Sequence, residues 1–305
     1  MLLCSSCSSG ADNSGRLSDE QPLLFLTVSS EQSAESIHPV PRGKQVINAL
    51  AEGYPERIKQ VEYRDDDWAL LLDGIWFYYA EGRMLPEHLR KKYADYDSIP
   101  FYMYPAELPE WEAPDAETGE RYRRMQNRRR ENPPKRSNYF LDTLWRSSSQ
   151  AESYDRQKSI YFLGKQVLVH YSILEELSLV EETIKTAART DSAVRKWITE
   201  LNSVVGYNWR QIAETESRSY HSYGAAVDVL PKQYDGLATY WLWSAQSNPE
   251  WWAIPYEKRL HPPDAVIKAF ESYGFVWGGK WGIFDTMHFE YRPEIMILSG
   301  FEVKK

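Results

Sequence analysis

Apolar residues recur at helical spacing through much of the second half of the chain. Residues 173–189 place them three and four positions apart, which predicts an amphipathic helix. A second helix is predicted directly afterwards, where Asp191 or Ser192 can cap its N-terminus. A third helix is predicted to begin at Pro263, because proline is favoured in a first turn, and to end at Gly274.

Short runs of β-prone residues predict strands between and before these helices. In the second half the predicted strands are residues 225–229, 275–277 and 287–292. On the last of them His288 and Glu290 share a face, because successive side chains of a strand point to opposite sides. In the first half, residues 68–79 predict a hairpin that turns at Asp73-Gly74. Helices and short strands without regular βαβ alternation predict an α+β fold.

The same patterns divide the chain into three parts. Residues 1–30 are predicted to be a flexible leader, because Ser, Asp and Gly dominate its composition. Residues 31–155 are predicted to be an accessory region that contains strands, and residues 156–305 a separate domain. Arginines cluster between residues 121 and 136. We interpret that cluster as a solvated helix face rather than as a surface for anionic polymers or lipid headgroups.

Composition excludes some classes of protein. The chain has 305 residues and a net charge of −8, which argues against nucleic acid as an electrostatic partner. No apolar run is long enough to span a bilayer, so no transmembrane segment is expected. The chain has 2 cysteines, Cys4 and Cys7, both close to its start. Disulfides and cysteine-ligated zinc are therefore excluded for the folded region.

The first residues resemble the end of a bacterial lipoprotein signal, in which Cys7 would carry the lipid. The positively charged and apolar segments of such a signal do not precede Cys7. The alternatives are therefore a lipid anchor at Cys7 and a polar leader without one.

Two separated segments of the second half carry candidate metal chemistry. The first contains His221 and Asp228, and the second contains Asp285 and His288. Two imidazoles and one carboxylate form a ligand set that zinc accepts, with a fourth position left for water. The remaining carboxylate, Asp285, is then free to move protons. This combination predicts a zinc hydrolase.

These residues resemble the M15 family of zinc peptidases, the D-alanyl-D-alanine carboxypeptidase and L-alanyl-D-glutamate endopeptidase group. The family pattern has Ser-x-His, a Gly, an Asp seven residues after the His, and later Asp-or-Glu-x-x-His. It is met here by Ser219, His221, Gly224, Asp228, Asp285 and His288. The resemblance covers roughly residues 160–305. It implies a small α+β domain with a central antiparallel sheet and flanking helices, one zinc ion held by His221, Asp228 and His288, and peptidoglycan stem peptides as substrate.

In this interpretation Asp285 is the general base. Zinc lowers the pKa of a coordinated water to about 7, and Asp285 would take its proton and hand it to the leaving amine. Arg210 stands where related enzymes carry an arginine, so it is expected to steady the oxyanion or grip a substrate carboxylate, with Arg218 as the competing candidate. Ser219 is expected either to bind substrate or only to shape its loop.

Further residues are candidates for the surroundings of the metal. Glu290 could orient a ligand imidazole or form an ordinary ion pair within its strand. Trp281 is expected to line the cleft. An aromatic segment lies between the two metal-ligand segments and comprises Tyr240, Trp241, Trp243, Trp251, Trp252 and Tyr256. It would either wall the cleft or form a separate hydrophobic cluster.

Three functional hypotheses remain open at this point. A carboxypeptidase would release the terminal D-alanine of a stem peptide, and we favour it slightly because the aromatic segment could close one end of the cleft. An endopeptidase would cut between L-alanine and D-glutamate. A binding module would hold zinc without cutting. In each case the bacterial cell envelope or periplasm is the expected location, with or without a lipid anchor.

Overall fold

The computed structural model describes residues 41–304 of the chain. The predictions for the leader, residues 1–30, and for Cys7 lie outside this range. Helices and antiparallel sheets make up the described part, which confirms the predicted α+β class. No helix between residues 41 and 304 is long and apolar enough to cross a membrane.

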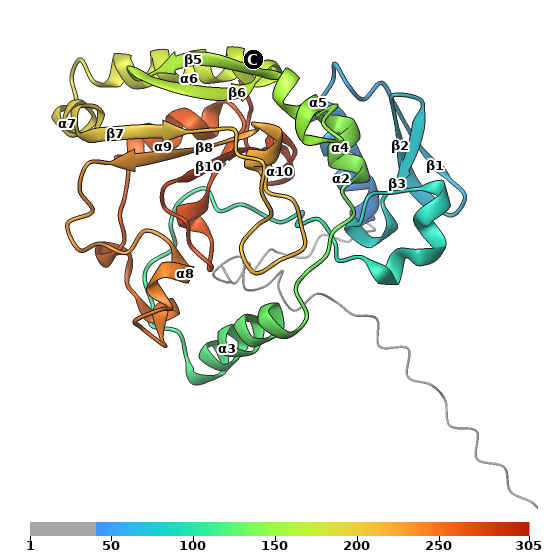
Figure 1. The fold of residues 1–305 in the computed structure, drawn as a ribbon, viewed down its shortest axis with the longest axis horizontal. Coiled ribbons are helices and arrows are strands. Elements are labelled where there is room, and N and C mark those ends of the chain that lie inside the picture. The colour runs from blue at the N-terminus through green and yellow to red at the C-terminus, as the bar shows by residue number, and fades with distance from the viewer. Residues whose placement is uncertain (1–40, 305) are drawn as a thin grey trace, which may run out of the picture.

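A four-stranded antiparallel sheet lies at the centre of the second half (Figure 1). Its order is β7 (Leu201–Val205), β8 (Ala226–Pro231), β10 (His288–Tyr291) and β9 (Phe275–Trp277). Every residue of β10 is buried, and β10 is an inner strand with neighbours on both sides. The three strands predicted in the second half are confirmed, with boundaries that differ by at most two residues.

Helices and a hairpin cover this sheet. The hairpin consists of β5 (Gln157–Phe162) and β6 (Lys165–His170), and it lies with α6 (Leu174–Ala187) along one side of the sheet (Figure 1). Helix α9 (Asp264–Ser272) packs against α6 and β9, and helix α7 (Ser192–Glu200) leads directly into β7. All three predicted helices are confirmed, and the side chain of Asp191 caps α7 by accepting from the amides of Ala193 and Val194.

The first half contains a second antiparallel sheet, which a helix precedes. Its strands are β1 (Gln60–Arg64), β2 (Asp67–Leu72), β3 (Ile75–Tyr78) and β4 (Leu85–Pro86), preceded by helix α2 (Arg42–Gly53). The predicted hairpin is confirmed as β2–β3. Asp73 and Gly74 both have positive φ, 48° and 81°, as the tight turn that joins twisted strands requires.

The two sheets share one hydrophobic core. Helix α2 packs against α10 (Pro293–Leu298), so the start of the described chain lies against its end. Leu50 of α2 and Phe77 of β3 belong to the same buried cluster as Val227 and Phe289 of the central sheet. The accessory region is thus packed onto the second half rather than separated from it by a linker.

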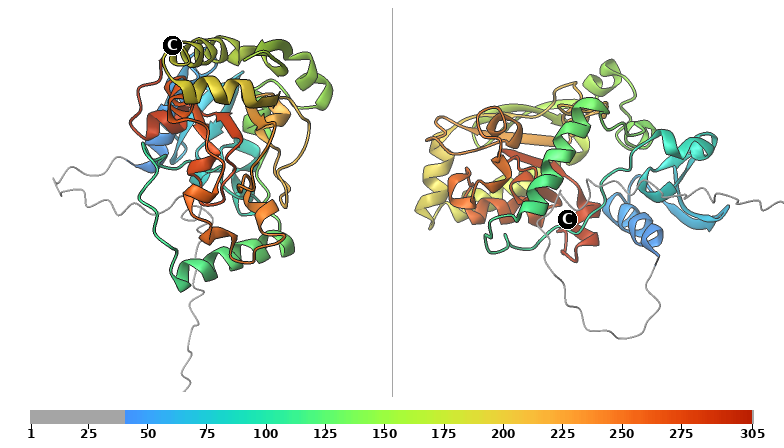
Figure 2. Two further views of the ribbon diagram at one scale, coloured as in Figure 1. Left: turned by 90° about the vertical axis from the view of Figure 1, so that its left-hand side faces the viewer. Right: turned by 90° about the horizontal axis from the view of Figure 1, so that it is seen from below.

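A smaller aromatic cluster lies on the opposite side of the molecule from the β5–β6 hairpin. Helix α3 (Ala116–Glu131) carries Tyr122 and Met125 into it (Figures 1 and 2). From the aromatic segment it receives Trp241, Trp251 and Trp252, of which Trp241 begins the short helix α8 (Trp241–Ser244). The separate hydrophobic cluster that the sequence offered as one alternative is therefore present.

The interpretation of the arginine run as a solvated helix face is only partly right. Most of its arginines lie on α3, but Arg129 is 5% exposed and its guanidinium lies 5.6 Å from the centre of the Trp241 ring. A guanidinium can be buried in this way because it stacks on an aromatic face. The remaining short helices of this region are α4 (Tyr139–Leu144) and α5 (Gln150–Asp155).

Candidate metal centre and cleft

The pairing of β8 with β10 brings the candidate ligands together. His288 lies directly opposite Asp228 in the antiparallel register, so both side chains leave the sheet on the same face. The His288 Nδ1 atom is 2.9 Å from Asp228 Oδ1. His221 reaches the same point from a short 3-10 helix, η4 (Tyr220–Tyr223), with its Nε2 atom 3.2 Å from both. The ligand atoms of the three residues all lie within 4.8 Å of one another.

Local backbone geometry fixes the position of His221. The Ser219 hydroxyl accepts from the backbone N–H of His221 at 3.3 Å and so caps η4. Gly224 ends the turn with φ of 69°, and a Cβ atom there would lie 1.9 Å from Gln157 Oε1. The His221 Nδ1–H donates to the carbonyl of Gly206 at 2.6 Å, which leaves the lone pair of Nε2 directed at the cluster.

The second imidazole is held from its far side by a carboxylate. The His288 Nε2 atom lies 3.2 Å from Glu290 Oε2, and both side chains are buried. This contact leaves Nδ1 of His288 facing Asp228. Burial lowers the pKa of His288, but hydrogen bonds to Asp228 and Glu290 outweigh burial and raise it to about 10. The cluster therefore favours a positive charge at its centre.

Asp228 carries the negative charge of the cluster. Its burial acts to raise the pKa, but the nearby imidazoles of His221 and His288 outweigh that effect and hold the pKa of Asp228 well below its usual range. An ionised aspartate between two imidazoles is the protonation state that metal binding needs.

Asp285 is placed differently from the three clustered residues. It lies in the turn before β10, where its backbone N–H donates to the Gly278 carbonyl at 3.0 Å and its backbone pairs with that of Tyr240. Its Oδ1 atom is buried, without a hydrogen-bond partner in the part of the chain that the structure describes. Burial, together with the charge of Asp228, raises the pKa of Asp285 to about 7.

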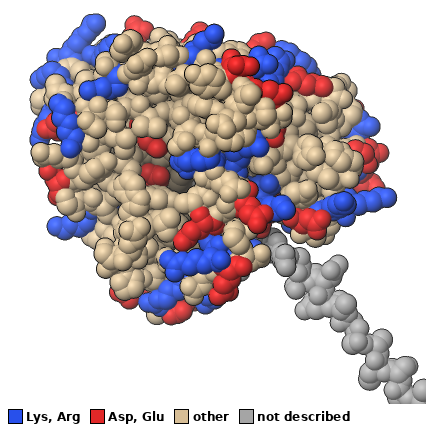
Figure 3. All heavy atoms as spheres, viewed as in Figure 1, with Lys and Arg blue, Asp and Glu red and all other residues tan. Residues whose placement is uncertain are grey.

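The cluster and Asp285 lie in one cleft with a volume of about 370 Å³. Figure 3 shows a hollow in this face of the molecule, with acidic side chains inside it and a patch of Lys and Arg beside it. Asp228, Asp285 and His288 line the cleft, and Tyr240, Trp241 and Trp243 form part of its wall. Part of the aromatic segment therefore also walls the cleft, so both alternatives for it are realised.

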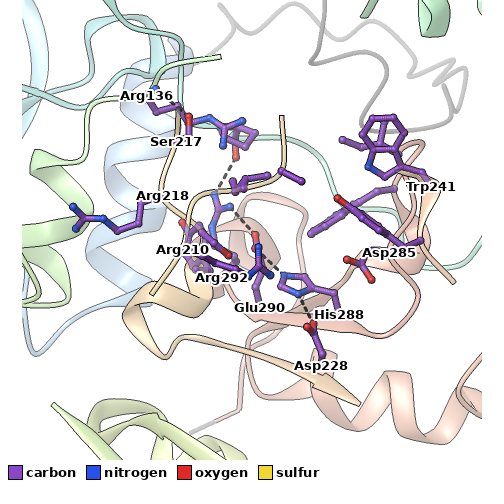
Figure 4. Close-up of a pocket in the computed structure, with 18 of the residues that line it drawn as sticks. Arg136, Arg210, Ser217, Arg218, Asp228, Trp241, Asp285, His288, Glu290 and Arg292 are labelled. Atoms are coloured by element: carbon purple, nitrogen blue, oxygen red, sulfur yellow. Dashed lines mark hydrogen bonds and ion pairs between the residues drawn. The ribbon is translucent and has the colours of Figure 1, made fainter. Parts of the chain in front are cut away.

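The remaining candidates occupy different positions around the cleft. Arg210 is exposed and lines it, and its charge acts to lower the pKa of Asp285. Arg218 also borders the cleft, but its side chain points away from Asp228 and His288 (Figure 4). Its guanidinium pairs with Asp142 and lies 4.3 Å from the centre of the Trp209 ring. This pairing makes Arg210 the stronger candidate for contact with a substrate.

Two further predicted residues adjoin the metal ligands. Ser219 is 4% exposed, and its hydroxyl caps η4, which is the loop-shaping role that the sequence offered as one alternative. The Trp281 ring lies 5.6 Å from that of His288 and lines the cleft. Its indole N–H donates to the Tyr102 hydroxyl at 3.1 Å.

Sequence reasoning missed the part of the cleft that the first half contributes. Ile99, Pro100 and Tyr102 line it, as do Arg136 and Arg129. No periodicity marks residues 99–102, which form an irregular segment. Arg292 also borders the cleft, and for this residue a signal was available, because it follows His288 and Glu290 at the two-residue spacing of one strand face.

Comparison with known proteins agrees with the geometry. Residues 213–291 match the model of an M15 peptidase family described as D-alanyl-D-alanine carboxypeptidase. Within this range the chain is similar to the M15 peptidases. The matched range contains all three clustered residues and Asp285, while Arg210 lies just before it.

A second match lies in the first half of the chain. Residues 46–101 match a domain of unknown function. No curated protein and no solved structure matches the chain. The M15 resemblance found in the sequence is thus confirmed, and the roles of the individual site residues stay predictions.

Proposed function

We propose that the chain is a zinc-dependent D-alanyl-D-alanine carboxypeptidase that acts on the stem peptides of peptidoglycan. The observation that carries this proposal is the carboxyl of Asp285, which has one buried oxygen without a hydrogen-bond partner among the described residues and shares a cleft with three converging metal-ligand side chains. A site that only held a structural ion would have no use for a further carboxyl of raised pKa beside it.

The donor set fits zinc. Two buried imidazoles and the partly exposed carboxylate of Asp228 converge, and each ring has its other nitrogen hydrogen-bonded as a metal ligand requires. Three protein ligands are typical of catalytic zinc, whereas structural zinc sites usually have four. When bound here by His221, Asp228 and His288, zinc would polarise the scissile carbonyl and make water more acidic.

Asp285 would move the proton of the reaction. With a pKa of about 7, its carboxylate can accept a proton from the attacking water at one oxygen and then donate it to the nitrogen of the leaving amine. Tyr240 and Trp241 form part of the wall of the same cleft. The peptide bond is thereby broken without a covalent intermediate on the protein.

Arg210 supports the choice of a carboxypeptidase over an endopeptidase. Its guanidinium is a planar cation that matches a carboxylate with two parallel hydrogen bonds, and it lies on the cleft that contains Asp285. The free carboxylate of a terminal D-alanine is such a group. We also place the protein outside the cytoplasm, in the bacterial cell envelope, because peptidoglycan is found there.

Digestion of purified stem peptides tests this proposal. The zinc-loaded protein should release one alanine from pentapeptides ending in D-alanyl-D-alanine, measured by mass spectrometry, and Asp285→Asn should not. A new N-terminal glutamate would instead identify an L-alanyl-D-glutamate endopeptidase. Stoichiometric zinc with every peptide left intact would contradict a peptidase and favour a zinc-containing binding module.

A further inference from the structure

A network of buried ionic contacts extends from the metal ligands. Glu290 contacts His288 through Oε2, and its other oxygen, Oε1, accepts from Arg292 Nη1 at 3.2 Å (Figure 4). The Arg292 Nε–H donates to Glu294 Oε1. Glu294 Oε2 in turn accepts from the Tyr54 hydroxyl at 3.1 Å. The contacts therefore run without a gap from a metal ligand to helix α2.

The charged groups of this network are buried, so each depends on its partners. Arg292 is 1% exposed and Glu294 is 2% exposed, so neither charge is solvated by water. A buried charge is tolerated only when its partners and hydrogen bonds are complete. Arg292 meets this condition by binding Glu290 and Glu294 with different nitrogens and by donating from Nη2 to the Pro100 carbonyl at 3.0 Å.

The far ends of the network belong to the region without an assigned function. Tyr54 caps the C-terminus of α2, and Pro100 lies in the irregular segment that lines the cleft. Both fall within residues 46–101, the range that matches a domain of unknown function. Arg292 and Glu294, by contrast, lie just beyond the end of the peptidase match at residue 291.

We propose that residues 46–101 support the metal centre. Tyr54 holds Glu294, and Glu294 and the Pro100 carbonyl hold Arg292, so that Arg292 fixes Glu290 against His288. Arg292, Glu294 and Tyr54 are positioning residues in this scheme, because they act on the metal through Glu290. The inference rests on the metal site of the proposed function but not on peptide cleavage.

The direction of the effect follows from the geometry. Glu290 has one oxygen on His288 and the other on Arg292, so a change in the orientation of Arg292 pulls the carboxylate away from the imidazole. Loss of a partner that orients a ligand imidazole typically weakens metal binding by about 10–100-fold. The same loss removes none of the three ligand side chains.

Zinc affinity, measured by competition with a chromophoric chelator, tests the inference directly. Arg292→Lys and Glu294→Gln should each weaken zinc binding by about tenfold or more. Tyr54→Phe should weaken it less, because Arg292 keeps its contact with Glu294. Thermal unfolding of the metal-free variants shows whether each one folds. If Arg292→Lys does not fold, Tyr54→Phe and Glu294→Gln still test the inference.

Tyr291→Phe is the matched control. Tyr291 is a buried tyrosine that packs edge-on against Tyr54, and its hydroxyl bonds Glu176 instead of a member of the network. It should lower stability by an amount similar to Tyr54→Phe and leave zinc affinity unchanged. Equal zinc affinity in wild type, Glu294→Gln and Arg292→Lys would overturn the inference. A wild type that binds zinc but cuts no peptide would overturn the proposed function alone.

Discussion

His170 is expected to make the stability of the protein fall in mild acid. Its ring is buried beside the site loop, and its backbone N–H donates to the carbonyl of Gly224 at 2.9 Å. The Nε2–H donates to the Trp145 carbonyl at 3.0 Å, while Nδ1 accepts from the backbone N–H of Ser172 at 3.2 Å. Burial keeps water from solvating a charged ring, so the folded state favours the neutral form.

The size of the effect follows from the shift in pKa. Burial, which outweighs the hydrogen bond to Trp145, lowers the pKa of His170 from 6.5 to about 4. The unfolded chain therefore binds one more proton than the folded chain between these two values, and stability falls as pH falls. Each pKa unit corresponds to about 1.4 kcal/mol, so the full loss is about 3 kcal/mol, most of it present by pH 4.5.

Urea unfolding of the metal-free protein between pH 7.5 and pH 4.5 measures this loss. His170→Gln serves as the comparison, because its amide can donate to Trp145 but does not titrate. The other titrating groups, His288 among them, are common to both proteins and cancel in the difference. The free energy of unfolding of wild type should fall by about 2–3 kcal/mol more than that of the variant. Parallel curves for the two proteins would refute the reasoning.

Three further predictions concern the cleft. Asp285→Asn should still bind zinc but lose about 10²–10⁴-fold in turnover, because the variant lacks the proton carrier. Steady-state kinetics and zinc analysis test this, and undiminished turnover would contradict the role assigned to Asp285. Gly224→Ala should lower the melting temperature and the zinc affinity, because its Cβ would clash with Gln157. Gly236→Ala is the control: its φ is similar, 74°, but its Cβ would meet open space, so both losses should be smaller. Arg210→Gln should lower kcat/KM about 10–100-fold for peptides with a free terminal carboxylate and little for their amides; equal losses on both would argue against carboxylate binding.

Local sequence patterns predicted the elements that carry the metal ligands. Asp228 and His288 lie on strands that β-prone runs and flanking glycines marked out, and Asp73-Gly74 specified a turn by its backbone preference alone. The spacing of residues in the two metal-ligand segments then matched a family pattern. Chemistry and local structure thus agreed before any tertiary contact was known.

The support around the site could not be predicted in the same way. Tyr54 and Glu294 are 240 residues apart, and no periodicity or motif relates them. The burial of Arg129 in the cluster with Trp241 likewise depends on where α3 docks, whereas its charge-rich sequence resembles that of an exposed helix. Such contacts depend on tertiary packing, which overrides the local polarity of the chain.

The central claim is that His221, Asp228 and His288 hold one zinc ion beside Asp285. Anomalous diffraction at the zinc absorption edge from crystals of the zinc-loaded protein tests it most directly. We predict a single strong peak about 2.0–2.2 Å from one ring nitrogen of each histidine and from an Asp228 oxygen, with the Asp285 carboxyl close by but outside bonding distance. A protein that takes up no zinc, or a peak that lies away from these three side chains, would contradict the account.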